Sequence, residues 1–157
     1  MATQTLQASR AISVIPDDNI VIPMPYEVVS GTNVLNLPTK LSDTAETFIT
    51  KGVKVGDVVY RTDNNTIATV TLVESETLLT LSASIFAAVA GVPYIIYTAG
   101  NNNGCLIYVG VGGDVAIETP AGDQVTLVGV PTGSFIPVHL IKIMSTGTTA
   151  TTIVALW

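Results

Sequence analysis

Charged residues are scarce in this chain. They make up 11% of its 157 residues, against about 25% in ordinary soluble domains, and Thr, Ser, Asn and Gly take their place. The 6 basic residues are scattered, so no Lys/Arg stripe exists that could release counterions from a nucleic acid. The formal net charge is −6. We therefore expect no nucleic-acid partner and no membrane-binding face, and a surface suited to contact with neighbouring proteins.

Reactive side chains are equally few. Cys105 is the single cysteine, so an intrachain disulfide is excluded, and its apolar strand predicts a buried, inert thiol of a protein made in a reducing cytoplasm. His139 is the single histidine, and a strand position predicts a surface or interface residue. Ser134 lacks a recognisable base, and Glu118 with Asp123 would form a carboxylate pair only by chance of the fold.

Two kinds of turn in the sequence resemble ligand-binding loops, one for phosphate and one for calcium. The glycine-rich stretch from Gly110 to Asp114 is followed by a strand-like segment instead of the helix that a phosphate loop needs, so it predicts a β-hairpin turn. The clusters that begin at Asp17 and Asp63 lack the further ligands of a calcium loop and predict ordinary turns. We therefore expect no catalytic residue, no cofactor site and no metal site, and a protein that is not an enzyme.

Long apolar runs are also missing. The longest, from Ile85 to Tyr97, is interrupted by Gly91 and Pro93 and is too short to cross a bilayer. The first residues lack the basic start and apolar core of a signal peptide. These observations predict a soluble cytoplasmic product, or one released by lysis.

Short β-strands dominate what is present. Residues 66–73 alternate apolar and hydroxyl side chains with the period of a half-buried strand. From Cys105 to Trp157, β-branched segments follow one another with Gly or Pro in each gap. Many short strands separated by turns predict an all-β fold, an antiparallel β-sandwich or small barrel of jelly-roll type with an inserted β-meander.

The organisation of the chain follows from the same pattern. Residues 1–32 and 104–157 are expected to form a core β-domain, and residues 33–103 an inserted β-meander that ends at the Asn101–Gly104 cluster. Residues 19–23 and 34–38 are expected to be short extended strands. Residues 42–48 allow one helical turn, because a Ser/Asp cap precedes Glu46, and residues 84–90 a short helix or a loop.

The two ends of the chain carry a family resemblance. The quoted strings are Ala11-Ile-Ser-Val-Ile-Pro-Asp-Asp-Asn-Ile-Val-Ile-Pro, Tyr108-Val-Gly-Val-Gly-Gly-Asp-Val, Gly122-Asp-Gln-Val-Thr-Leu, Val130-Pro-Thr-Gly-Ser-Phe-Ile-Pro-Val and the segment from Thr146 to Trp157. Together they resemble the head spike base family of gene transfer agents and tailed phages. The middle block, from Gly52 to Tyr60 and from Thr66 to Thr71, is similar to segments of marine and cyanobacterial phage structural proteins.

The resemblance implies a phage virion structural protein. The expected role is an oligomeric capsid decoration, a cement protein or a head vertex spike base, located on the particle surface after assembly in the host cytoplasm. Its partners would be the major capsid protein or another virion protein, together with further copies of itself. The alternatives are a tail baseplate, adaptor or fibre-attachment protein, and a carbohydrate-binding β-domain. The last is disfavoured because Tyr60, Tyr94, Tyr97 and Tyr108 have positions typical of a core.

Candidate subunit contacts lie at the two ends of the chain. They are apolar side chains of the N-terminal arm and of the last strand: Ile12, Val14, Ile15, Val154, Leu156 and Trp157. Tryptophan is enriched at interfaces, although closing a core is an equal alternative for Trp157. The threonines between Thr146 and Thr152 suit either ladders at an oligomer contact or an ordinary exposed strand face.

Overall fold

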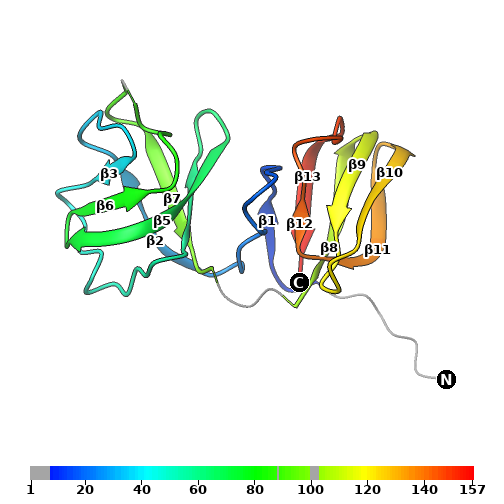
Figure 1. Ribbon diagram of the computed structural model, residues 1–157, viewed down its shortest axis with the longest axis horizontal. Coiled ribbons are helices and arrows are strands. Elements are labelled where there is room, and N and C mark those ends of the chain that lie inside the picture. The colour runs from blue at the N-terminus through cyan, green and yellow to red at the C-terminus, as the bar shows by residue number, and fades with distance from the viewer. Residues whose placement is uncertain (1–7, 88, 100–102) are drawn as a thin grey trace. The chain divides into compact units, whose positions relative to one another are not determined.

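The computed structural model describes residues 8–87, 89–99 and 103–157, and these form strands and turns without a helix. Every strand pairing is antiparallel. The strands are β1 (Ala11–Ser13), β2 (Glu27–Thr32), β3 (Lys40–Ser42), β4 (Val58–Arg61), β5 (Thr66–Ser75), β6 (Leu78–Leu81), β7 (Pro93–Tyr97), β8 (Cys105–Val111), β9 (Gly113–Glu118), β10 (Gln124–Val130), β11 (Ser134–Leu140), β12 (Lys142–Ile143) and β13 (Thr151–Leu156). The predicted all-β class is confirmed (Figure 1). No helix able to cross a membrane is found within these ranges.

The chain divides into two compact units. Unit 1 comprises Met1–Pro25 with Asn102–Trp157, and unit 2 comprises Tyr26–Asn101. The sequence-based boundary after residue 32 falls at the end of β2, and β2 pairs with β7 of unit 2. Each unit has its own sheets and its own buried residues, so the two are described separately.

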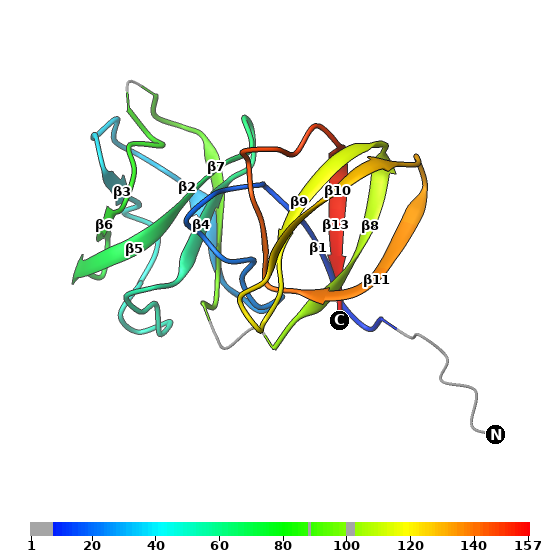
Figure 2. The same ribbon diagram turned by 45° about the vertical axis from the view of Figure 1, so that its right-hand side comes forward.

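Unit 1 contains two sheets. One has the order β1-β13-β8-β11 and the other the order β10-β9-β12 (Figure 2). Alternate residues of β8, beginning at Cys105, are buried, as the period of a strand requires. They pack in a core with Val115 and Ile117 of β9 and with Ile153 of β13, all at most 2% exposed. The arrangement is a small sandwich whose two sheets cover each other's apolar faces.

The chain passes between these sheets at the glycines after β8. Strands β8 and β9 belong to different sheets, so the predicted hairpin at Gly110–Asp114 is wrong in its pairing although both strands exist. A Cβ on Gly112 would lie 2.5 Å from the Val130 carbonyl oxygen and 2.7 Å from the Thr132 nitrogen. Only glycine allows the backbone to approach this closely, which explains the glycine-rich stretch without a ligand.

Unit 2 is a single curled sheet with the order β2-β7-β4-β5-β6-β3. Its two edges approach each other where the Val34 nitrogen donates to the Ser42 carbonyl oxygen at 2.7 Å. The long strand β5 has register shifts on the side of β6, and such bulges increase twist and bend a strand. The sheet therefore wraps around its apolar face as a partly closed barrel.

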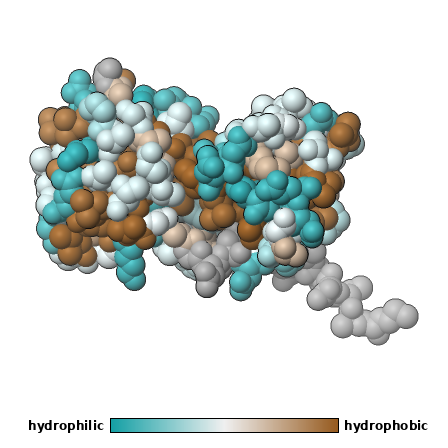
Figure 3. All heavy atoms as spheres, in the orientation of Figure 1, coloured by the Kyte–Doolittle hydropathy of each residue, from teal (hydrophilic) through white to brown (hydrophobic). Residues whose placement is uncertain are grey.

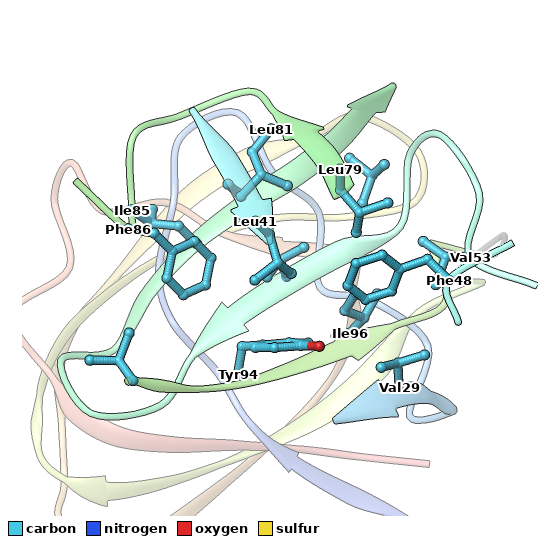
Figure 4. Packing of buried hydrophobic residues seen from close by; sticks show 14 residues of the cluster. Val29, Leu41, Phe48, Val53, Leu79, Leu81, Ile85, Phe86, Tyr94 and Ile96 are labelled. Atoms are coloured by element: carbon cyan, nitrogen blue, oxygen red, sulfur yellow. The ribbon is translucent and has the colours of Figure 1, made fainter. Parts of the chain in front are cut away.

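The core of unit 2 gathers around an aromatic cluster (Figure 4). The ring of Tyr94 lies 6.4 Å from the ring of Phe48 and 6.3 Å from that of Phe86, centroid to centroid. Leu41 and Leu79 have no exposed surface. Burying one side chain of this size stabilises the fold by about 1.5–3 kcal/mol. The core draws on all six strands of the sheet, and loop residues such as Phe48 and Phe86 belong to it, so its packing holds the connecting loops in place.

Several local predictions are wrong. Residues 19–23 form no strand, because Pro23 and Pro25 cannot donate to a ladder, although the Ile22 nitrogen donates to the Ile141 carbonyl at 2.8 Å. Residues 34–38 form no strand, and residues 42–48 form turns without a helical turn. The described part of residues 84–90 is a loop, one of the two forms expected.

Candidate functional site

The most structured polar site in unit 2 surrounds a hollow of about 510 Å³ between the end of β2 and the loop after β3. Residues 31–34 supply one wall, Asp43, Ala45 and Glu46 supply another, and Gly91 completes the lining. Two buried polar residues anchor these walls, Asn33 with no exposed surface and Asp43 with 3%. Burying such groups is costly unless they are hydrogen-bonded, so their partners decide what they do.

Asn33 ties three loop segments together. Its Nδ2 donates to the Leu35 carbonyl at 3.0 Å and to the Val89 carbonyl at 2.9 Å. Its Oδ1 accepts from the Val92 nitrogen at 2.9 Å. The backbone adds bonds from the Asn33 nitrogen to the Val92 carbonyl and from the Gly91 nitrogen to the Asn33 carbonyl. The amide has both donors and its acceptor in use, so it holds the loops in place and leaves no polar atom waiting for a ligand.

Asp43 is satisfied in the same way. Its Oδ2 accepts from the Tyr94 hydroxyl at 2.8 Å and from the Thr32 nitrogen at 3.2 Å, and its Oδ1 accepts from the Ala45 nitrogen at 3.0 Å. Burial first, and then the hydrogen bond to Asp43, raise the pKa of Tyr94 far above its ordinary value. A tyrosine so held is a hydrogen-bond donor to the carboxylate and not an acid or base near neutral pH.

Gly31 permits this contact. A Cβ there would lie 2.4 Å from Asp43 Oδ2 and 2.8 Å from the Tyr94 hydroxyl oxygen. Three exposed apolar side chains, which we call the rim, belong to residues held around Asn33: Val34, a lining residue, is 40% exposed, and Leu35 and Val89, whose carbonyls Asn33 bonds, are 49% and 36% exposed. Glu46, on the lining, is ion-paired to Lys51. The hollow is therefore held by hydrogen bonds on both walls and bordered by apolar side chains, an arrangement that suits binding.

Charged side chains outside the hollow are also held by hydrogen bonds within the chain. Hydrogen bonds from Arg61 lower the pKa of Asp63, and those from Lys142 and Gln124 lower the pKa of Glu118. Arg61 also donates to the Ile85 carbonyl at 2.7 Å, which anchors the loop after β6. Within the described ranges no group of three or more His, Cys, Asp or Glu is placed to hold a metal ion. These carboxylates are fixed in their charged form by structural partners.

The predicted turns are present with different partners. Asp17 Oδ1 accepts from the nitrogens of Asn19 and Ile20 at 2.8 Å, as a turn residue does. Asp63 pairs instead with Arg61, with Nε and Oδ1 2.6 Å apart.

A second, apolar pocket of about 240 Å³ lies in unit 1. It brings together residues that the sequence singled out separately, namely Cys105, His139, Leu156 and Trp157, beside Phe135. The Cys105 thiol is buried, as predicted, and donates to the Leu140 carbonyl at 3.4 Å. His139 is exposed on β11. Trp157 Nε1 is buried, and no residue within the described ranges is its hydrogen-bond partner.

The candidate subunit contacts lie together inside unit 1. Strand β1 pairs with β13, with Ile12 opposite Ala155. Ile12 and Val14 are each 8% exposed, whereas Ile15, Val154, Leu156 and Trp157 are half-buried. The two ends of the chain therefore meet each other, and their role between subunits stays a prediction.

The threonines near the C-terminus also bond within the chain. The Thr148 hydroxyl accepts from the Ala116 nitrogen at 2.9 Å, and the Thr149 hydroxyl accepts from the Asp114 nitrogen at 2.8 Å. Thr146 donates to Asp18. Thr148 and Thr149 thus take partners on β9, a role that the sequence did not suggest, whereas Thr151 and Thr152 are exposed on strand β13, one of the two roles expected.

Taken by its fold, the chain is an all-β, two-unit protein with a structured hollow in one unit. The comparison with protein families matches the C-terminal domain of penicillin-binding protein 5 over residues 4–78. The matched range runs from unit 1 through β5 to the start of β6 in unit 2, and includes Asn33 and Asp43. Neither the curated proteins nor the solved structures give a match.

This match overturns the phage interpretation. The family to which residues 4–78 are similar is a domain of a bacterial penicillin-binding protein and not a phage or gene transfer agent spike base. The match therefore contradicts three expectations that the resemblance gave: the virion roles on head or tail, the location on the particle surface, and the capsid partner. The carbohydrate-binding alternative gains no support either, since Tyr60 and Tyr94 are buried and Tyr97 and Tyr108 half-buried. The quoted strings are strand-and-turn sequences that different β-folds share.

Proposed function

We propose that this chain is a non-catalytic β-module of the bacterial cell envelope, which binds an extended segment of an envelope protein in the hollow beside Asn33 and Asp43. The family similarity over residues 4–78 supports the cellular setting. The chain contributes binding and positioning, and the chemistry belongs to whatever it holds.

The observation that carries the proposal is the rigid hollow itself. Its volume of about 510 Å³ falls within the range of about 300–1,000 Å³ usual for binding sites. The hydrogen bonds of Asn33 and Asp43 fix both walls before anything binds, so little conformational entropy is lost on association. The apolar rim formed by Val34, Leu35 and Val89 supplies surface whose burial favours binding.

The test is sedimentation of the purified chain with isolated bacterial envelopes. We expect the wild type to sediment with envelopes, and to stop doing so when the envelopes are first treated with protease. The double variant Val34→Asp with Leu35→Asp should lose binding, because it places two charges on the apolar rim. Leu72→Asp, at a 53% exposed position on β5, is the matched control and should bind as the wild type does.

Two results would reject the proposal. One is a wild type that stays in the supernatant at every envelope concentration. The other is rim and control variants that sediment equally, which would place the binding surface elsewhere. Circular dichroism of each variant separates lost binding from lost folding.

A further inference from the structure

A single Asn-Gly sequence occurs in the chain. Asn103 is followed by Gly104, whereas every other asparagine precedes Ile, Val, Leu, Thr or another Asn. Asparagine is a thermally labile residue, because the backbone nitrogen of the next residue can attack its side-chain carbonyl carbon. A side chain on that next residue obstructs the attack, and glycine has none. Asn103 is therefore the asparagine whose neighbour hinders this reaction least.

The position of Asn103 in the fold exposes its amide to water. The residue is exposed and lies outside the strands, two positions before Cys105 begins β8. None of the residues that the structure describes is a hydrogen-bond partner of its side-chain amide. Asn33 is the opposite case, because it is buried and has both donors and its acceptor in use. The Asn103 side chain is thus not held in one rotamer by such bonds, and it can turn its carbonyl carbon toward the main chain.

The fold requires glycine at position 104. Gly104 has a φ of +107°, a backbone conformation that residues with a side chain rarely adopt. A Cβ there would lie 2.9 Å from His139 Cβ and 3.2 Å from His139 Nδ1. His139 belongs to β11, whose next residue, Leu140, pairs with Cys105 at the start of β8. A larger residue would therefore disturb the pairing of β8 with β11, so the structure itself keeps Asn103 next to a glycine.

We propose that Asn103 is a site of self-modification, at which the amide is converted to a carboxylate without an enzyme. The Gly104 nitrogen attacks Asn103 Cγ, and the bond between Cγ and Nδ2 breaks. The proton of the attacking nitrogen passes through water to Nδ2, which leaves as ammonia. Water then opens the resulting succinimide at one of its two carbonyls, which gives aspartate or isoaspartate. Water is the co-reactant, and no electrons are transferred.

The product changes both the charge and the backbone of unit 1. Pale side chains of intermediate hydropathy cover much of the face shown in Figure 3, and charged residues make up 11% of the chain, so one new carboxylate is a large local change. Isoaspartate also adds a carbon to the main chain just before Gly104, which lines the apolar pocket with His139 and Trp157. Because the conversion runs in one direction, the converted fraction records the age of the molecule.

The experiment follows the purified full chain during incubation in mildly alkaline buffer, which speeds the attack because the nitrogen has to give up its proton. Isoelectric focusing should show a growing form with one more negative charge than the −6 of the fresh chain. In water enriched in heavy oxygen, peptide mapping by mass spectrometry should place the labelled carboxylate at Asn103. Asn36, also exposed but followed by Leu37, is the internal control and should convert at least about tenfold more slowly, since a branched neighbour hinders the attack.

Two variants test the assignment. Asn103→Gln keeps an amide but would have to close a larger ring, so it should not accumulate the acidic form. Asn36→Gln is the matched control and should age as the wild type does. A protein isoaspartate methyltransferase with labelled S-adenosylmethionine should methylate the aged wild type and not the aged Asn103→Gln protein. Circular dichroism of the fresh variants shows that both are folded.

Three results would overturn the proposal. They are a wild type that gains no acidic form, an acidic form that accumulates equally in Asn103→Gln, and equal rates of conversion at Asn103 and Asn36. The site lies in unit 1 and the hollow in unit 2. Since the charge and mass of the chain alone are measured, this result does not depend on whether the chain binds envelopes.

Discussion

The hydroxyl of Tyr94 donates a 2.8 Å hydrogen bond to Asp43 across 51 positions of sequence. This bond joins strand β7 to the loop after β3, which lines the hollow in unit 2. Because Asp43 is only 3% exposed, its carboxylate needs these donors in place of water.

Removing that donor should destabilise unit 2. Tyr94→Phe leaves the Asp43 carboxylate with backbone donors alone, and we expect a loss of about 1–3 kcal/mol in the free energy of unfolding. Urea unfolding followed by circular dichroism measures it. Tyr97→Phe, on the same strand, removes a hydroxyl without taking a donor from Asp43 and should cost less. Equal losses in the two variants would contradict the assigned role.

Alkaline pH should act through the same residue. Burial and Asp43 raise the pKa of Tyr94 above its ordinary value of 10.0. Above that value the unfolded chain loses the phenolic proton while the folded chain keeps it, so stability falls as pH rises. Urea midpoints between pH 8 and about 11 should decline more steeply in the wild type than in Tyr94→Phe. Parallel declines would show that Tyr94 does not control this response.

Acid should weaken unit 1 through Glu118. Hydrogen bonds from Lys142 first, and then from Gln124, lower the pKa of Glu118 below its ordinary value of 4.5. The stabilisation is therefore present above that pH and is lost as pH falls below it. Trp157 is the single tryptophan and its fluorescence reports unit 1. Glu118→Gln should flatten the dependence between pH 7 and about 3.5, whereas Glu74→Gln in unit 2 should leave the Trp157 signal unchanged.

Gly31 should resist even the smallest side chain. In Gly31→Ala the new Cβ would lie 2.4 Å from Asp43 Oδ2, so the loop or the Tyr94 bond has to shift. We expect a destabilisation of about 1–3 kcal/mol and weaker envelope binding. Ser30→Ala, at the exposed neighbouring position, is the control. A Gly31→Ala protein as stable as this control would show that the hollow is less rigid than its hydrogen bonds indicate.

The strands could be predicted wherever side-chain types alternate along the sequence with the two-residue period of a strand. Residues 66–73 alternate side-chain types, and β5 covers them as Thr66–Ser75. Cys105 lies on the buried face of β8 for the same reason. Residues 19–23 have strand composition, but Pro23 and Pro25 interrupt the ladder and leave isolated hydrogen bonds. The prolines were visible in the sequence, but the partner of this segment was not, since the Ile22 nitrogen bonds to the Ile141 carbonyl far along the chain.

The hollow in unit 2 was not predictable as a site. The Ser/Asp cap at Ser42–Asp43 was visible as a local signal. Its partner Tyr94 was visible only as a strand residue with a core pattern. What joins them is the curvature of the sheet, which brings β2, β3 and β7 to one end. The sequence also could not show that β8 and β9 belong to different sheets, because hairpins and sheet-to-sheet crossings use the same glycine-rich turns.

The pairing of β1 with β13 has a consequence for the order of folding. Unit 2 is continuous in sequence, from Tyr26 to Asn101, so a ribosome can release all of its strands before β8 has been made. Unit 1 needs β1 from before that block and β13 from after it. The first strand must therefore stay unpaired until the last one emerges, and the closing step spans nearly the whole chain. Contacts of such long sequence separation form slowly, so unit 1 should appear after unit 2 during synthesis and during refolding.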